Sequence, residues 1–372
     1  MNIKEKAVGN KWMVSSAHPL ATKAGIKILE SEGNAFDAAI AVASTLNVVE
    51  PFMSGLGGIG VALVHIAKTN EVKVLDFSGK TPSNTHLDLF KNPTIQDKHN
   101  QKHVGTSGPK TALIPGNLAG WHEIHKKYGT KPWASLFKDA ISHATSGYKV
   151  TPFAEKIMAG ASERLSKMGS ISQLSDDNSQ LPKAGSKIYA HKLAESLRKV
   201  SEFGPKVFYE GEIAEKIAVG CEENGGQINI EDLRKYKPEW KEPIHINYKN
   251  HIIYGAPPNS TAFQILQTLK LLELLEIDQF SQESSDFLHL FLESAKLAVS
   301  DRIEYAGDPI KNPVPVDKLL SEIYLKGQLK RININKASFS PGDRFLSHRP
   351  AEALRPGEFD GGSTTHLAVA DK

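Results

Sequence analysis

DGGSTTHLAVAD, residues 360–371, is the most informative stretch of this sequence. Gly361 and Gly362 give the backbone unusual freedom. Thr364 follows shortly after them, and the alternation beyond it predicts a strand. A hydroxyl is a poor nucleophile at neutral pH and needs a base. A threonine at a chain N-terminus has one, because its own α-amine can take the hydroxyl proton.

Thr364 would have to create that N-terminus itself. Its hydroxyl would attack the carbonyl carbon of Ser363, the peptide would become an ester, and water would then separate the two pieces. The preceding glycines would let the scissile backbone take the strained geometry that this step needs. The same residues also fit an ordinary loop that leads into a strand, so the stretch alone leaves both interpretations open.

Composition excludes several other classes of protein. The 372 residues are 40% hydrophobic and 23% charged, which is typical of a globular chain with one large or two medium domains. Lys+Arg 45 against Asp+Glu 42 gives a net charge of +3, which is too mild to predict a nucleic-acid or membrane partner. The single cysteine, Cys221, excludes an intramolecular disulfide, a zinc site built from cysteines and an iron–sulfur cluster.

The N-terminal residues and the hydropathy pattern bear on localisation. MNIKEKAVGNKW, residues 1–12, is charged and has no apolar core, so a signal peptide is not expected. No uninterrupted apolar run reaches the roughly 18 residues of a membrane span. These features predict a cytoplasmic protein.

Hydrophobic periodicity predicts a mixed α and β chain. Helices are expected at 19–32, 35–49, 115–126, 133–145, 151–166, 190–202, 210–223, 260–275, 285–305 and 316–329. Strands are expected at 61–67 and 72–77, with a hairpin at 244–254. Residues 167–187 read as an exposed excursion and 331–363 as a flexible connector. The lack of regular βαβ alternation favours an α+β fold over a doubly wound parallel sheet.

Two further motifs imitate known sites. GLGGIG at 55–60 has the spacing of a dinucleotide loop, but a predicted helix precedes it and a strand follows, which is the reverse of the required context. A tight turn is therefore favoured over a nicotinamide enzyme. HEIH at 122–125 places two histidines three residues apart, whereas a zinc protease needs four, so a solvated helix face is favoured.

Many short motifs, in a consistent order, resemble the γ-glutamyltranspeptidase family of the N-terminal-nucleophile hydrolases. The resemblance covers most of the chain. Its motifs are MVSSAHPLA (13–21), GNAFDAA (33–39), VVEP (48–51), SGLGG (54–58), IPGNLAGW (114–121), GP (204–205), FYEG (208–211), NGG (224–226), PP (257–258), DR (301–302), Tyr305, GDP (307–309) and TTH (364–366).

The resemblance implies an αββα sandwich, cleavage between Ser363 and Thr364, and Thr364 as the acyl-accepting nucleophile. Residues 1–363 would form the large subunit and 364–372 the start of the small subunit. The activity implied is hydrolysis or transfer of γ-glutamyl groups from glutathione and related amides, without cofactor or metal. The partners implied are a small amide substrate and the rest of the small subunit, as a downstream segment or a separate chain. In the family, a small-subunit Gly-Gly turn stabilises the oxyanion, and Gly57-Gly58 is not that turn.

The chain departs from the family pattern at substrate-binding positions. Ser78 stands where typical members have the arginine that holds the substrate's α-carboxylate, and Gly79 where they have glutamate. A guanidinium makes a two-pronged, charge-assisted contact that serine cannot replace. Lys80 could supply a point charge, or it could be an ordinary solvated side chain. An acylase with a different acyl group, or a non-catalytic relative, is therefore the alternative.

A second departure is PPNSTA at 257–262, where the family usually ends in paired glycines. The third is length, since only nine residues, 364–372, follow the expected cleavage point. We therefore expect the 372 residues alone to be inactive and to expose a sheet edge, which favours association.

Overall fold

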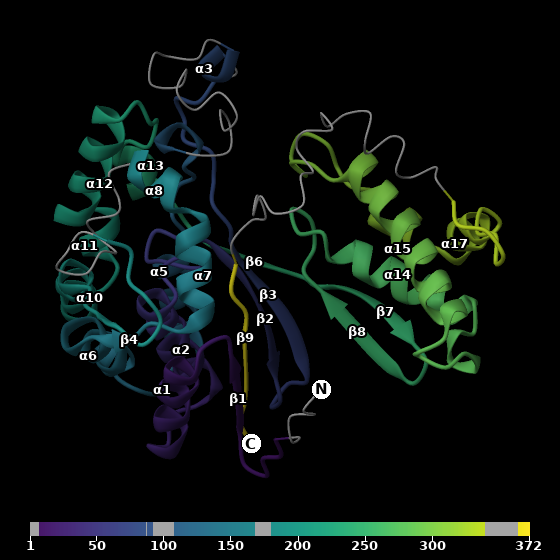
Figure 1. Cartoon of the computed structure of the whole chain (residues 1–372), viewed down its shortest axis with the longest axis horizontal. Coiled ribbons are helices and arrows are strands. Elements are labelled where there is room, and N and C mark those ends of the chain that lie inside the picture. Colours follow the sequence, from purple (N-terminus) through teal and green to yellow (C-terminus); the bar gives the residue numbers. More distant parts are fainter. Residues whose placement is uncertain (1–6, 87, 92–107, 168–179, 339–363) are drawn as a thin grey trace. The chain divides into compact units, whose positions relative to one another are not determined.

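The computed structural model describes residues 7–86, 88–91, 108–167, 180–338 and 364–372. The chain forms two compact units (Figure 1). Unit 1 comprises Met1–Gly60, Phe77–Pro238 and Phe359–Lys372. Unit 2 comprises Val61–Asp76 and Glu239–Glu358. Among the described residues, no helix is both long enough and apolar enough to cross a membrane.

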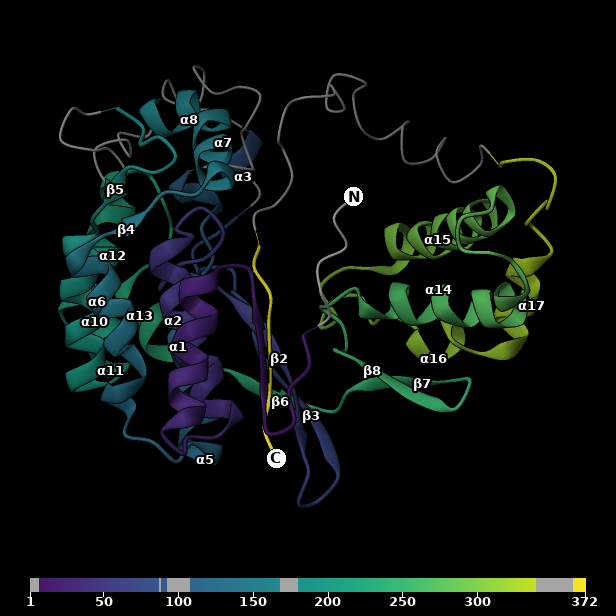
Figure 2. The same ribbon diagram turned by 60° about the horizontal axis from the view of Figure 1, so that its bottom comes forward.

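A two-stranded antiparallel sheet in unit 1 brings together segments from near both ends of the sequence. Strand β1 (Met13–Ser16) pairs with β9 (Leu367–Ala370), so that Ser16 lies opposite Leu367 (Figures 1 and 2). Leu367 and Val369 pack on a core cluster supplied by helices α1 (Pro19–Glu30) and α2 (Ala35–Val49). The strand predicted after His366 is therefore confirmed, and its alternate residues face the two helices.

Helix α2 is buried almost all round, as its alanine and valine content predicts. It begins with a capping box in which Asn34 accepts from the Asp37 backbone and the Asp37 carboxylate accepts from Asn34. Asp37 is fully buried and also accepts hydrogen bonds from the Thr130 backbone, the Thr130 hydroxyl and the Lys131 backbone. The start of α2 is thereby tied to a loop nearly a hundred residues away in sequence.

The remaining elements of unit 1 are mostly helices that pack around α2 or beyond it (Figure 1). They are α3 (Asp88–Lys91), η1 (Pro109–Thr111), α5 (Asn117–Tyr128), η2 (Trp133–Phe137), α6 (Lys138–Ser146), β4 (Tyr148–Lys149), α7 (Pro152–Gly160), α8 (Ser162–Lys167), β5 (Lys187–Ile188), α10 (His191–Phe203), α11 (Lys206–Tyr209), α12 (Glu212–Glu223) and α13 (Ile230–Lys235). The helix predicted at 133–145 begins as the 3₁₀ turn η2, and the one at 151–166 is interrupted at Ala161.

The glycine segment 54–60 is a tight turn between α2 and the next strand, as its context predicts. The Gly58 carbonyl accepts hydrogen bonds from the backbones of Gly116 and Asn117 at the start of α5. A Cβ on Gly58 would lie 2.5 Å from the Asn117 side chain. The glycine is needed for this close approach.

Unit 2 is built from strands and a separate group of helices. Strands β2 (Gly60–Ile66), β3 (Glu71–Phe77) and β6 (Glu239–Lys241) form one sheet, and β7 (Ile244–Tyr248) pairs with β8 (His251–Gly255) in the predicted hairpin. The helices are α14 (Ala262–Leu274), η3 (Ile277–Gln279), α15 (Ser285–Tyr305), α16 (Val316–Leu319) and α17 (Glu322–Leu329).

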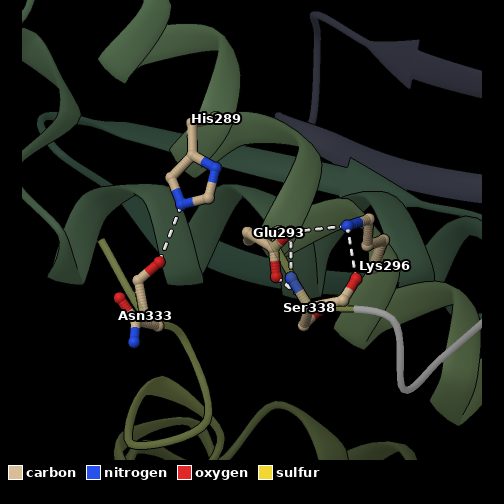
Figure 3. Close-up of polar contacts among 5 residues, drawn as sticks. All are labelled: His289, Glu293, Lys296, Asn333 and Ser338. Carbon is tan, nitrogen blue, oxygen red and sulfur yellow. Dashed lines mark hydrogen bonds and ion pairs between the residues drawn. The ribbon is translucent and has the colours of Figure 1, made fainter. Parts of the chain in front are cut away.

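Helix α15 buries polar groups that fix the chain after α17. Glu293 is 2% exposed and accepts hydrogen bonds from Lys296 and from the backbone and hydroxyl of Ser338 (Figure 3). His289 bonds to the Asn333 carbonyl at 2.8 Å. The first residues of the predicted connector are therefore held against α15, and residues 339–363 lie outside the described part.

Candidate active site

Thr364 lies three residues before β9, and its side chain is exposed. The alternation of the strand extends back to it, so that Thr365, Leu367 and Val369 face inward while Thr364 and His366 face outward. Ser363, the other residue of the predicted cleavage point, lies outside the described residues. The structure thus presents the Thr364 side chain on the face of the strand opposite the α1 and α2 core.

The segment is fixed against α2 at both of its ends. Asp371, just after β9, accepts a 2.7 Å hydrogen bond from the backbone of Ala35 at the start of α2. Thr365, at the other end, lies beside Glu50, the C-cap of α2. The fifteen residues of α2 span about 22 Å, and the extended chain from Thr365 to Asp371 spans about 20 Å. Strand and helix are therefore matched in length.

Glu50 is a buried titratable group beside Thr365, the residue that follows the predicted nucleophile. It is 4% exposed, and its backbone N–H donates to the Leu46 carbonyl at 2.9 Å. Burial raises the pKa of the Glu50 carboxyl above its usual value, and the Thr365 hydroxyl opposes this by lowering the pKa. The negative end of the α2 dipole also disfavours a charged carboxylate at this position.

Ser78 and Lys80 lie together around Tyr236. The Tyr236 hydroxyl donates to the Ser78 carbonyl at 2.7 Å. The Lys80 side chain is exposed, with its ammonium 6.0 Å from the centre of the Tyr236 ring, and its carbonyl accepts from the Ile114 backbone at 2.9 Å. This segment is anchored through its backbone, and it presents a small hydroxyl and a lysine where the family carries arginine.

Gly79 has no room for the glutamate found in typical members. A Cβ at this position would lie 2.5 Å from Leu113 Cβ and 2.9 Å from Ile59 Cγ2. Ile59 and Leu113 are themselves 49% and 40% exposed. Two apolar side chains therefore fill the space beside Gly79, so the chain departs from what the resemblance implies at more than one residue.

Sequence reasoning missed Glu50 and Tyr236 as members of these groups. Glu50 was interpretable only as the end of a helix, although a glutamate that directly follows a buried helix rich in alanine and valine is a usable signal for a buried carboxyl. Tyr236 carries no such signal. The histidines of the 122–125 motif have structural contacts, since His122 packs edge-on against Trp133 and His125 bonds to the Lys131 carbonyl. Within the described residues, no three His, Cys, Asp or Glu side chains cluster as metal ligands.

Comparison with known proteins places this geometry in context. The family model for γ-glutamyltranspeptidase matches residues 21–372. The glutathione hydrolase proenzyme of Escherichia coli is 33% identical over 97% of this chain and 60% of its own length. The acylase ACY 1 proenzyme of Pseudomonas sp. strain V22 is 31% identical over 99% of this chain and 64% of its own length.

The fold is also found among solved structures. The γ-glutamyltranspeptidase of Helicobacter pylori superposes with a TM-score of 0.82 at 31% identity, covering 96% of this chain and 98% of that one. The fold is thus that of the N-terminal-nucleophile hydrolases, which confirms the predicted α+β sandwich class. The chain belongs to the γ-glutamyltranspeptidase family. It spans 60–64% of the length of the curated relatives named above.

Proposed function

We propose that this chain is the large-subunit region of a self-cleaving proenzyme, together with the first residues of its small subunit. The Thr364 hydroxyl attacks the Ser363 carbonyl carbon, and the Thr364 nitrogen leaves as an amine while an ester forms. Water then hydrolyses the ester, which leaves a carboxylate on Ser363 and a free α-amine on Thr364. Both curated relatives described above are named as proenzymes, which supports this proposal.

In the proposed turnover, the same threonine acts on an external amide. Its α-amine takes the hydroxyl proton as the oxygen attacks the γ-glutamyl carbonyl carbon. The acyl group becomes an ester on Thr364, and the departing amine takes the proton. Water or an amino acid then accepts the acyl group and restores the hydroxyl. Gly58 does not serve as the oxyanion donor in this proposal, because its N–H already donates to the Gly55 carbonyl at 2.9 Å.

The observation that carries the proposal is the exposure of Thr364 at the start of a strand that is itself firmly held. Strand β9 is paired with β1 and packed on α2, so its direction is fixed. The Thr364 side chain stays on the accessible face. A nucleophile needs this combination of rigid support and open approach.

Scission is tested by replacing the nucleophile in protein expressed from its full open reading frame. Mass spectrometry should find two fragments whose boundary is the Ser363–Thr364 bond. Thr364→Ala should remain uncut and inactive, whereas Thr364→Ser, which keeps a hydroxyl, should still cut. A wild-type protein that stays intact, or a Thr364→Ala variant that is cut at the same bond, would contradict the proposal.

A second candidate function is an acylase of the same family with a different acyl group. Ser78 lacks the guanidinium, and Ile59 and Leu113 occupy the space beside Gly79. Both changes favour an acyl group without the α-carboxylate of glutamate. The likeness to the acylase ACY 1 proenzyme supports this alternative.

The two acyl preferences are separated by restoring the missing charge. Wild-type enzyme and Ser78→Arg should be compared on glutathione, γ-glutamyl-p-nitroanilide and butyryl-p-nitroanilide, which lacks the α-amino and α-carboxylate groups. If the acylase interpretation holds, wild type prefers the butyryl amide, and Ser78→Arg shifts the kcat/KM ratio toward γ-glutamyl amides by about tenfold or more. A wild-type enzyme that prefers glutathione would eliminate the acylase interpretation. In that case Lys80→Met tests whether Lys80 supplies the positive charge that binds the α-carboxylate.

A further inference from the structure

Three buried polar atoms without partners gather at the C-terminal end of α2. Asn47 Oδ1, Glu50 Oε2 and Thr365 Oγ1 are all buried and make no hydrogen bond of normal geometry with the described residues. Asn47 is held from its other side, since its Nδ2 donates to the Ser54 hydroxyl at 3.0 Å. Buried polar groups are nearly always paired. Three such atoms in one place therefore point to a contact that forms in another state of the segment.

The three groups are neighbours for a simple geometric reason. Asn47 lies in the last turn of α2, and Glu50 is the C-cap of the same helix three residues later. Thr365 reaches the same place because it points inward from the segment that leads into β9. Its hydroxyl is near enough to lower the pKa of the Glu50 carboxyl, but the two groups make no hydrogen bond of normal geometry. A rotation of the Thr365 backbone that brings its hydroxyl toward Glu50 would pair the two.

A rotation of the Thr365 backbone also moves Thr364. The two threonines share one peptide unit, and their side chains point to opposite faces of the segment. Catalytic hydrogen bonds are often long or misaligned in the resting state and tighten only in the reacting geometry. The orientation of the Thr364 hydroxyl is thus coupled to the fit between Thr365 and Glu50.

We infer that Glu50 is a positioning residue for Thr364: its carboxyl accepts the Thr365 hydroxyl when the two threonines adopt the geometry of scission. This inference rests on the proposed function. Glu50 touches neither the scissile bond nor the substrate in this scheme and acts through Thr365 alone. The Asn47 side chain is held in place by its hydrogen bond to the Ser54 hydroxyl.

The inference is tested by the rate at which the precursor is cleaved after in vitro translation of the full open reading frame. The cleavage is measured by mass spectrometry at several pH values between 5 and 9. Glu50→Gln leaves only a neutral acceptor, and Thr365→Val removes the hydroxyl at constant shape. Each should slow cleavage about tenfold, and the double variant should be hardly slower than either one. Thr365→Ser should restore the rate. Glu30→Gln, at the exposed last residue of α1, is the matched control and should cut like wild type.

The pH profile separates positioning from a merely structural role. Burial and the Thr365 hydroxyl are the influences that the described residues exert on Glu50, and no charged side chain among them contributes. Wild-type cleavage should therefore fall on the acid side as the carboxyl becomes protonated, and Glu50→Gln should lack that step. Equal rates and profiles in wild type, Glu50→Gln and Thr365→Val would overturn the inference. So would slow cleavage with an unchanged profile. A wild-type precursor that is never cut would instead overturn the proposed function.

Discussion

At the scale of single residues, the His18 side chain caps a helix in a way that makes the folded protein less stable in acid. Its Nδ1 accepts a 3.2 Å hydrogen bond from the Leu20 backbone at the start of α1. That nitrogen must be unprotonated in order to accept. Burial lowers the pKa of His18 below its usual value of 6.5, and the nearby His143 lowers it further.

This cap should weaken in acid. A histidine with a lowered folded-state pKa is protonated first in the unfolded chain, so stability falls as pH decreases below about 6.5 toward the lowered value. His18→Asn keeps an acceptor that does not titrate, and should therefore lose less stability than wild type between pH 7.5 and pH 5.5. His18→Ala should lose about 1 kcal/mol at pH 7.5, because the cap is gone.

Urea unfolding at the two pH values provides the measurement. His122 and His143 also have lowered pKa values, so some acid sensitivity should remain in every variant. An identical pH dependence in wild type and His18→Asn would show that the cap does not titrate as described.

Residue roles were predictable from the sequence only where chemistry is local. Thr364 could be chosen because the glycines, the second threonine and the strand pattern all lie beside it, although its role as nucleophile stays a prediction. The contact between Glu50 and Thr365 could not be predicted, because it depends on a strand that follows more than 300 residues later. The filling of the Gly79 space by Leu113 and Ile59 is equally non-local.

At the scale of elements, patterns of small and apolar residues predicted most helices well. They did not predict the buried face of a helix when that face contains polar residues. The buried α2 was predicted with its observed bounds, since its alanine and valine content indicates a buried helix and Glu50-Pro51 marks its end. In α15, however, the apolar residues at a spacing of four are Phe287, Phe291, Ala295 and Val299. The buried residues are instead Leu290, Glu293, Ser294, Leu297, Ala298 and Asp301. Three polar members hide this face from a hydrophobicity pattern.

Other elements were missed for related reasons. Strand β6 is short and lies between Pro238 and Pro243, so nothing local marks it as a strand. It forms because Leu75 and Asp76 of β3 offer it a partner, opposite Trp240 and Glu239. The helix predicted at 316–329 divides where Ser321 caps the second half by accepting from the Tyr324 backbone.

The buried Glu293 of α15 should contribute measurably to stability. Burial alone would raise the pKa of this carboxyl, but hydrogen bonds from Lys296 and Ser338 together lower it (Figure 3). Glu293→Gln keeps the shape but leaves Lys296 without its charged acceptor, so it should reduce the free energy of unfolding by about 1.5–3 kcal/mol.

The comparison needs an exposed control. Glu283→Gln, just before α15, should change stability by less than about 0.5 kcal/mol. Ser338→Ala combined with Glu293→Gln should cost less than the sum of the two single changes, because they share one contact. Full additivity in urea unfolding would mean that Ser338 and Glu293 are not coupled.

At the scale of the whole molecule, the proposed scission point and the compact units divide the chain differently. Cleavage would separate 1–363 from 364–372, yet unit 1 contains residues on both sides of that bond. The division into two units was not predicted, because each is discontinuous in sequence and defined by long-range contacts. The sandwich class came from the family resemblance, since periodicity alone indicated only a mixed α and β chain.

A polypeptide of residues 1–372 alone should associate and lack turnover. In the described part of the chain, β1 and β9 pair only with each other, so each leaves one edge open. Sedimentation should show mass rising with concentration, and Ala370→Lys, which places a charge on the exposed face of β9, should reduce it. Hydrolysis of γ-glutamyl-p-nitroanilide should stay at background. A monomer at every concentration would contradict the open edges, and enzyme-like hydrolysis would contradict the need for further residues.

The attachment of β9 has a consequence for what a cut would do to the molecule. The pairing with β1, the apolar packing of Leu367 and Val369, and the Asp371 contact with α2 all lie on the downstream side of the Ser363–Thr364 bond. A freshly made amino terminus would therefore be held in register by non-covalent bonds that already existed before the break. Cleavage of this kind breaks one peptide bond and leaves the surrounding contacts intact. The two products should therefore copurify and separate only when a denaturant is added.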